Sequence, residues 1–242
     1  MKPDIRARSL GDGIAVRAIV FDFDGVIVDT ETSLLQSWMD LFAHHGCPPP
    51  SLVEWKRRIG SSLNRDLMPN LLKYCPEIDE HEARRWRVQR SRELCAQENV
   101  MPGVTNWLRD AGEQGVLLGV ASSSPSEWVL GNLRRLSVSD SFTAISCAGP
   151  RIPGKPAPDL YLRTCAALGV PPEAALAVED SPNGIRAAKL AGLLCIAVPN
   201  KLTSDMDLSQ ADLVIPSLAD CTFEEAVGRL AADQRLRAQG RT

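Results

Sequence analysis

The sequence predicts an α/β protein with a doubly wound, mostly parallel sheet and an inserted all-helical module. Short apolar, β-branched runs, which are typical of buried strands, alternate with helical patterns along most of the chain. One long stretch, residues 32–100, carries helical patterns and no strand pattern. We therefore expect an α/β core formed by residues 1–31 and 101–242, interrupted after its first strand by a helical insertion at residues 32–100.

The expected elements follow from hydrophobic spacing and from turn residues. A first apolar strand leads from Ala18 into Asp22, and we expect further strands at residues 116–121, 142–147, 174–178, 195–198 and 213–215. Between the later strands, helical spacing occurs at residues 128–136, 160–168 and 184–191. The insertion has helical patterns from residue 32 to Gly46 and at residues 53–59, 65–74 and 81–97. A charged, alanine-rich surface helix is expected from Phe223 onward.

Composition indicates an ordinary soluble protein. The 242 residues have a net charge of −3, which gives no sign of a nucleic-acid or membrane partner. No apolar run approaches the roughly 18 residues that a membrane span needs, so we expect a cytoplasmic protein. We expect this protein to be a monomer, with a dimer as the alternative. Seven cysteines without close spacing predict buried thiols in a reducing compartment.

The first strand ends at two aspartates, Asp22 and Asp24, and Gly25 follows at once. In an extended chain, residues i and i+2 face the same side about 7 Å apart, so a phosphoryl group could fit between the two carboxylates. One carboxylate could attack while the other protonates the leaving group. A turn at Asp24 and Gly25 would explain one of the acids but not both.

Residues 18–31, through Asp29 and Thr30, resemble the first motif of the haloacid dehalogenase-like phosphotransferases. The later strands also end in polar residues that resemble this family's remaining motifs in order: Ser122, then Lys155, then the pair Glu179 and Asp180. Taken singly, these residues could be helix caps or a solvated lysine. Their joint occurrence at successive strand ends favours an active site, because ligands of open α/β sheets bind there.

The resemblance implies a role for each residue. Asp22 would be the nucleophile, and Asp24 the general acid and base. Mg²⁺ would be held by Asp22, the backbone carbonyl of Asp24 and Asp180, with Glu179 bound directly or through water. Ser122 and Lys155 would hold phosphoryl oxygens. We expect Ser123 and Asn183 to be further substrate contacts.

The helical insertion lies where the phosphoglucomutase-like and phosphoglycolate-phosphatase-like branch of the family has its cap. We therefore expect a Mg²⁺-dependent phosphatase that hydrolyses a small phosphorylated metabolite, such as a sugar phosphate, through an aspartyl-phosphate. The cap residues expected to face the site are Trp38, Arg58, Ser61 and Ser62. A hexose-phosphate mutase is the alternative enzyme, and a non-enzymatic interaction protein with the same fold is a more remote alternative.

Two positions argue against the mutase. In β-phosphoglucomutases, a histidine after the first motif helps to close the site, and a cap arginine holds the distal phosphate. Alignment to that family places Leu34 at the histidine position and Leu63 at the arginine position.

Two other motifs are set aside. Residues 149–155 match the G-x-x-x-x-G-K pattern of a nucleotide-binding loop, but Pro156 stands where that loop needs a hydroxyl. The histidines in the insertion, His44, His45 and His81, have no cysteine or carboxylate at the spacing of a zinc site.

Overall fold

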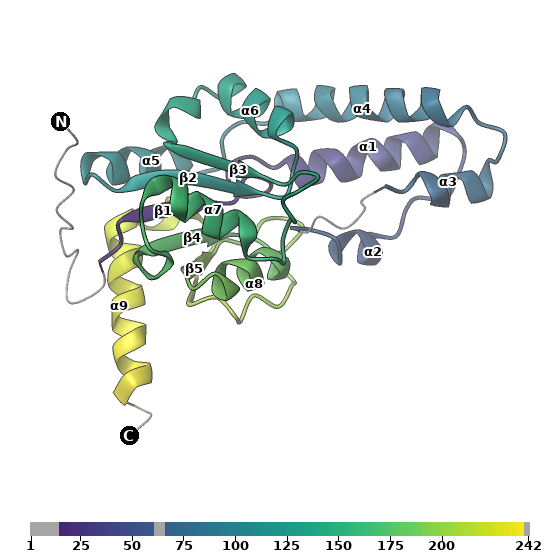
Figure 1. Cartoon of the computed structure of the whole chain (residues 1–242). Coiled ribbons are helices and arrows are strands. Elements are labelled where there is room, and N and C mark those ends of the chain that lie inside the picture. The colour runs from purple at the N-terminus through teal and green to yellow at the C-terminus, as the bar shows by residue number, and fades with distance from the viewer. Residues whose placement is uncertain (1–14, 61–65, 240–242) are drawn as a thin grey trace.

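The computed structural model describes residues 15–60 and 66–239, and in this part of the chain six strands form one parallel sheet (Figure 1). The order across the sheet is β3-β2-β1-β4-β5-β6. Their bounds are Ala18–Phe21 (β1), Leu117–Ser122 (β2), Ala144–Cys147 (β3), Ala175–Glu179 (β4), Leu194–Ala197 (β5) and Leu213–Val214 (β6). The predicted α/β fold class is confirmed.

Strand β1 lies at the centre of the sheet, between β2 and β4. Its last residue, Phe21, is opposite Val120 of β2 and Val178 of β4. Because all three strands are parallel and in this register, they end at the same edge of the sheet within two residues of one another. Polar residues that follow these strands are therefore brought together.

Helices cover both faces of the sheet, and β1 contributes to both hydrophobic clusters. Since strand side chains alternate between faces, Ile19 and Phe21 belong to one cluster, whereas Ala18 and Val20 belong to the other. The first cluster includes residues of α5 (Val104–Glu113), α6 (Ser126–Arg135) and α9 (Phe223–Gln239). The second includes residues of α7 (Asp159–Leu168) and α8 (Pro182–Leu190).

Helix α9 packs more deeply than its sequence predicted. We expected a surface helix, but Phe223, Val227 and Leu230 are completely buried in the first cluster. Their spacing of four and three residues places them on one face of the helix. The remaining faces carry the charged residues that suggested exposure. Among the described helices, none is long and apolar enough to pass through a membrane.

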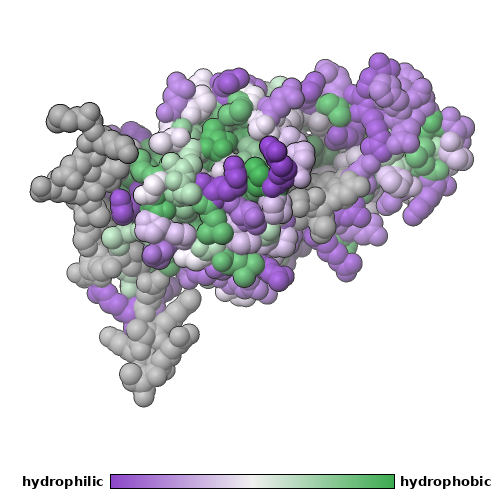
Figure 2. All heavy atoms as spheres, viewed as in Figure 1, coloured by the Kyte–Doolittle hydropathy of each residue, from purple (hydrophilic) through white to green (hydrophobic). Residues whose placement is uncertain are grey.

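Four helices between β1 and α5 form the helical insertion, which is called the cap from here on: α1 (Thr30–His44), α2 (Leu52–Lys56), α3 (Met68–Tyr74) and α4 (Glu80–Gln97). Helix α1 begins two residues before the predicted start of the insertion, because the Asp29 carboxylate caps it by accepting a hydrogen bond from the Thr32 amide. Helices α1 and α4 lie side by side (Figure 1). Figure 2 shows mostly hydrophilic side chains over α4, as expected for its arginine-rich sequence.

The cap has its own hydrophobic cluster, which includes Trp38, Phe42, Trp55 and Met68. Leu202, which follows β5 in the core, also belongs to this cluster. The cap is therefore packed against the core by apolar contacts as well as through the polar contacts described below.

Candidate active site

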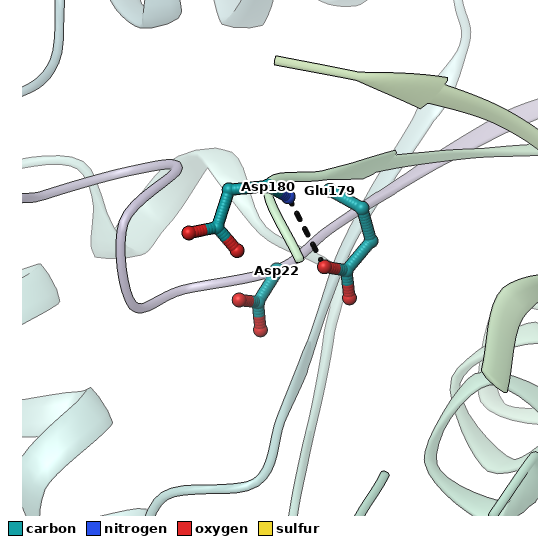
Figure 3. A group of neighbouring side chains, drawn as sticks. All are labelled: Asp22, Glu179 and Asp180. Atoms are coloured by element: carbon teal, nitrogen blue, oxygen red, sulfur yellow. Dashed lines mark hydrogen bonds between the residues drawn. The ribbon is translucent and has the colours of Figure 1, made fainter. Parts of the chain in front are cut away.

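Four buried charged residues meet where the central strands end. Asp22 directly follows β1, Glu179 ends β4 and Asp180 comes next, while Lys155 lies in the loop between β3 and α7. Oxygen atoms of the three carboxylates lie within 4.8 Å of one another. Figure 3 shows the three side chains pointing into the same space.

Lys155 is the cation at the centre of this acidic group. Its Nζ lies 2.5 Å from Asp22 Oδ1 and 2.6 Å from Glu179 Oε1. The ammonium is completely buried, and the two nearby carboxylates raise its pKa despite the opposing effect of burial. A protonated lysine in such a place can neutralise part of the charge of a bound anion.

Two of the carboxylates, Asp22 and Asp180, have raised pKa values. Burial raises the pKa of Asp22 to about 8, and the negative charges of Glu179 and Asp24 add to this effect although Lys155 opposes it. Burial also raises the pKa of Asp180 well above its usual value, with further contributions from Asp22 and Glu179. Ionised acids held this closely favour an additional cation between them.

The donor set fits a hard divalent cation. Asp180 Oδ1 is buried and has no hydrogen-bond partner, while Asp180 Oδ2 accepts a hydrogen bond of 2.6 Å from Asn200 Nδ2. The amide of Asn200 thus fixes the carboxylate and leaves one oxygen available beside Asp22. Carboxylate oxygens are the ligands that Mg²⁺ prefers.

Glu179 is already surrounded by donors. Its Oε1 accepts hydrogen bonds from Lys155 Nζ and from the Tyr161 hydroxyl at 2.6 Å. Its Oε2 accepts from the Asp180 amide at 3.1 Å (Figure 3) and from the Ser181 hydroxyl at 3.3 Å. Gly184 leaves room for this carboxylate, since a Cβ there would lie 2.0 Å from its atoms. In this arrangement Glu179 orients Lys155.

Asp24 faces a different set of donors. Its carboxylate accepts hydrogen bonds from the hydroxyls of Thr30 and Ser124, both at 2.5 Å. The Ser122 hydroxyl and Trp128 Nε1 donate to it as well, each at 3.3 Å. The Ser122 hydroxyl, which we expected to hold phosphoryl oxygens, is therefore engaged with Asp24 in this structure. It also accepts a hydrogen bond from the Ser124 amide at 3.0 Å.

Ser123 and Asn183 connect the core to the cap. The Ser123 hydroxyl donates to the backbone carbonyl of Gly60 at 3.3 Å and accepts from the Lys155 amide at 3.0 Å. Asn183 Nδ2 donates to the carbonyl of Ile59 at 2.8 Å. Both residues were expected to contact substrate, and the contacts that the structure gives them are with the backbone.

The cap candidates differ in their position. The ring of Trp38 is buried in the cap cluster, with the Arg87 guanidinium 4.9 Å from the ring centre. Arg58 is half-buried and directly precedes Ile59 and Gly60, which contact the core. Ser61 and Ser62 lie outside the described residues.

Sequence reasoning missed Tyr161 and Asn200. Asn200 comes three residues after β5, so the rule that ligands bind at strand ends could have identified it. Tyr161 lies inside helix α7, six residues after Lys155. A helical tyrosine is most often a core residue, and no sequence pattern showed that its hydroxyl reaches Glu179.

Comparisons with known proteins agree with this geometry. The family model described as "Haloacid dehalogenase-like hydrolase" matches residues 19–198. The Bacillus subtilis protein named "Putative phosphatase YhcW" is 36% identical over 206 residues, which cover 85% of this chain and 93% of that protein. Hexitol phosphatase B of Escherichia coli K12 is 31% identical over 219 residues, 88% of this chain and 97% of that protein.

A solved structure is similar along most of the chain. The CbbY variant of Rhodobacter sphaeroides in complex with xylulose-(1,5)bisphosphate has a TM-score of 0.66 and 26% identity, and the match covers 85% of this chain and 96% of CbbY. Asp22, Lys155 and the pair Glu179 and Asp180 lie within residues 19–198, the part of the chain that the family model matches. The chain therefore belongs to the haloacid dehalogenase-like hydrolase family.

Proposed function

We propose that this chain is a Mg²⁺-dependent phosphatase that hydrolyses a small phosphorylated metabolite, a sugar phosphate or a similar compound, through an aspartyl-phosphate. The observation that carries the proposal is the buried group of Asp22, Lys155 and Asp180, in which one carboxylate oxygen has no hydrogen-bond partner. The names of two similar proteins, a hexitol phosphatase and a CbbY variant bound to a sugar bisphosphate, support the substrate class.

In the proposed reaction, Asp22 attacks phosphorus and the bond to the leaving oxygen breaks. Lys155 stabilises negative charge on the phosphoryl oxygens because its ammonium is already placed beside the attacking carboxylate. Asp22, Asp180, the Asp24 carbonyl and Glu179 would hold Mg²⁺, with Glu179 acting directly or through water. The bound cation would supply further neutralisation of the phosphoryl charge.

Asp24 is proposed as the general acid, which donates a proton to the leaving oxygen and later accepts one from the attacking water. Four donors hold its carboxylate at its present position. To act as an acid, the side chain has to turn away from Thr30 and Ser124 toward the leaving group. Ser122 would then be released to hold a phosphoryl oxygen.

The cap is proposed to select the substrate. Ile59 and Gly60 contact Asn183 and Ser123, and Ser123 also contacts the Lys155 amide, so this part of the cap lies beside the loop that carries Lys155. A Cβ at Gly60 would lie 1.9 Å from the Ser181 hydroxyl, which explains a glycine at this close approach. Arg58, together with Ser61 and Ser62, is proposed to contact the part of the substrate beyond the phosphate.

A phosphatase is favoured over a hexose-phosphate mutase by the residues that a mutase would need. Leu34, at the position of the mutase histidine, is half-buried against the cap cluster and has no polar atom in its side chain. Leu63, at the position of the arginine, lies outside the described residues. The complete set of acids and the lysine also disfavours a purely structural or interaction protein.

The first prediction tests phosphatase against mutase. With β-glucose 1-phosphate and a catalytic trace of its bisphosphate, we expect no glucose 6-phosphate, because no cation is available at these positions to retain the distal phosphate. Phosphorus NMR measures the two glucose phosphates and inorganic phosphate in the same sample. A separate panel of phosphorylated metabolites, assayed for phosphate release, identifies the substrate. Stoichiometric glucose 6-phosphate without inorganic phosphate would overturn the assignment.

The second prediction concerns the metal. Saturating Mg²⁺ should raise the Tm of the purified chain by roughly 5–10 °C at about one hundred times Kd, because the ion binds only the folded carboxylate group. Asp180→Asn should lose this response and should melt higher than the wild type in chelator, since it removes one of the repelling charges. Asp140→Asn, at an exposed position, is the control and should respond to Mg²⁺ like the wild type. An unchanged response in Asp180→Asn would rule out the proposed ligand.

The third prediction separates the two aspartates. Asp22→Asn should abolish turnover and covalent phosphorylation. Asp24→Asn should slow hydrolysis of an alkyl phosphate by about 10²–10⁴-fold and that of an activated aryl phosphate much less, because a good leaving group needs little protonation. Steady-state kinetics on both substrates provide the measurement. Equal losses on the two substrates would contradict the acid role of Asp24.

The fourth prediction assigns Tyr161 a positioning role. Tyr161→Phe removes one donor from Glu179 and should lower kcat/KM by about 10–100-fold, since Glu179 then holds Lys155 less firmly. Tyr74→Phe, at an exposed tyrosine of the cap, is the matched control and should leave kcat/KM unchanged. A Tyr161→Phe enzyme with wild-type kcat/KM and Mg²⁺ affinity would show that the hydroxyl has only a packing role.

A further inference from the structure

Two cysteines that are 28 residues apart in the sequence meet in the cap. The sulfur atoms of Cys47 and Cys75 lie 3.0 Å from each other. Both residues are half-buried, whereas sequence analysis had predicted buried thiols. The two sulfur atoms would have to move about 1 Å closer to reach the length of a disulfide bond, roughly 2.05 Å.

Helix ends hold both thiols in place. Cys47 follows α1, where its amide donates to the Phe42 carbonyl at 2.8 Å and Gly46 adopts a positive φ of 66°. Cys75 ends α3, where its amide donates to the Leu71 carbonyl at 3.0 Å. Both thiols also contact the carbonyl of His45, at 3.6 and 3.7 Å. Backbone hydrogen bonds at the ends of α1 and α3 therefore hold the two cysteines in position next to each other.

We propose that Cys47 and Cys75 form a thiol–disulfide exchange site, which takes a small-molecule disulfide such as oxidised glutathione and closes into an intramolecular disulfide. One protein thiolate attacks a sulfur of the small disulfide, breaks its S–S bond and releases one thiolate. The second protein thiolate then attacks the protein sulfur of the mixed disulfide and releases the other thiolate. The two cysteines are oxidised, the small disulfide is reduced, and the two protein protons end on the released thiols.

The closed ring contains the part of the cap that meets the core. Between the two cysteines lie α2 and the turn at Ile59 and Gly60. Lys56, at the end of α2, forms an ion pair of 2.5 Å with Asp205 of the core. A disulfide would join the two ends of this segment and restrict its freedom in the unfolded chain, so the oxidised protein should be harder to unfold.

The reaction should be slow at neutral pH. The hydrogen bond with Cys75, followed by burial, raises the pKa of Cys47 to about 11. The reacting thiolate is therefore scarce at neutral pH, and exchange is better measured in alkaline buffer. Cys147, which is also half-buried, serves as an internal comparison.

The fifth prediction is the outcome of oxidation of the full chain. With excess oxidised glutathione at about pH 8.5, the intact mass should fall by two hydrogen atoms, and peptide mapping should show Cys47 linked to Cys75. The Tm should rise by roughly 5–10 °C and return after treatment with dithiothreitol. Cys47→Ser should instead retain one glutathione on Cys75, and Cys147→Ser should form the same linkage as the wild type.

Three results would overturn the proposal. The first is persistent glutathione adducts on Cys47 or Cys75 of the wild type, because the second thiol would then have failed to close the ring. The second is a linkage that involves other cysteines, and the third is a pair that stays reduced while Cys147 reacts. None of these readouts depends on enzymatic activity.

Discussion

The buried ammonium of Lys155, held between Asp22 and Glu179, is the interaction on which the rest of the site depends. A lysine in the protein interior stays charged only when carboxylates compensate for the lost water. Removal of one partner from such a group typically costs about 3–5 kcal/mol, because the remaining charge is left uncompensated. Conversely, Asp22 and Glu179 would repel each other without the lysine. With Asp180 the group has three carboxylates and one ammonium, and a divalent cation can offset the excess of negative charge.

The Ser123 hydroxyl connects the cap to the loop that carries Lys155. Ser123 accepts a hydrogen bond from the Lys155 amide and donates one to the Gly60 carbonyl. Movement of the cap away from the core would break the second bond and leave the first. The position of the lysine loop is thus connected to the cap through one side chain, while Asn183 and Ile59 form a second contact beside it. This connection offers a physical route by which substrate enclosure and catalytic alignment can occur together.

Much of the fold and of the acidic site could be predicted from the sequence. Apolar runs indicated the strands because a strand buried on both faces needs apolar residues throughout. Asp22 and Asp180 could be predicted because each directly follows a strand, where parallel strands bring their carboxyl termini together. Lys155 lies eight residues after β3 and was predicted through its resemblance to a family motif. Helix α9 was predicted as a surface element, because its buried face is a minority of an otherwise charged sequence. Trp38 was considered for substrate contact, although such a large apolar side chain more often packs in a core.

The sequence by itself predicted the strands, most of the helices, the position of the helical insertion and the acids at the strand ends, because these follow from local spacing of residue types. Helix α5 was not among the predicted elements. Only the tertiary structure decided the contacts between distant residues. These are the Tyr161 hydroxyl on Glu179, the Asn200 amide on Asp180, the four donors around Asp24 and the proximity of Cys47 to Cys75. Each depends on how helices and loops pack in three dimensions, and hydrophobic periodicity specifies which face of an element is buried but not which side chain it will meet.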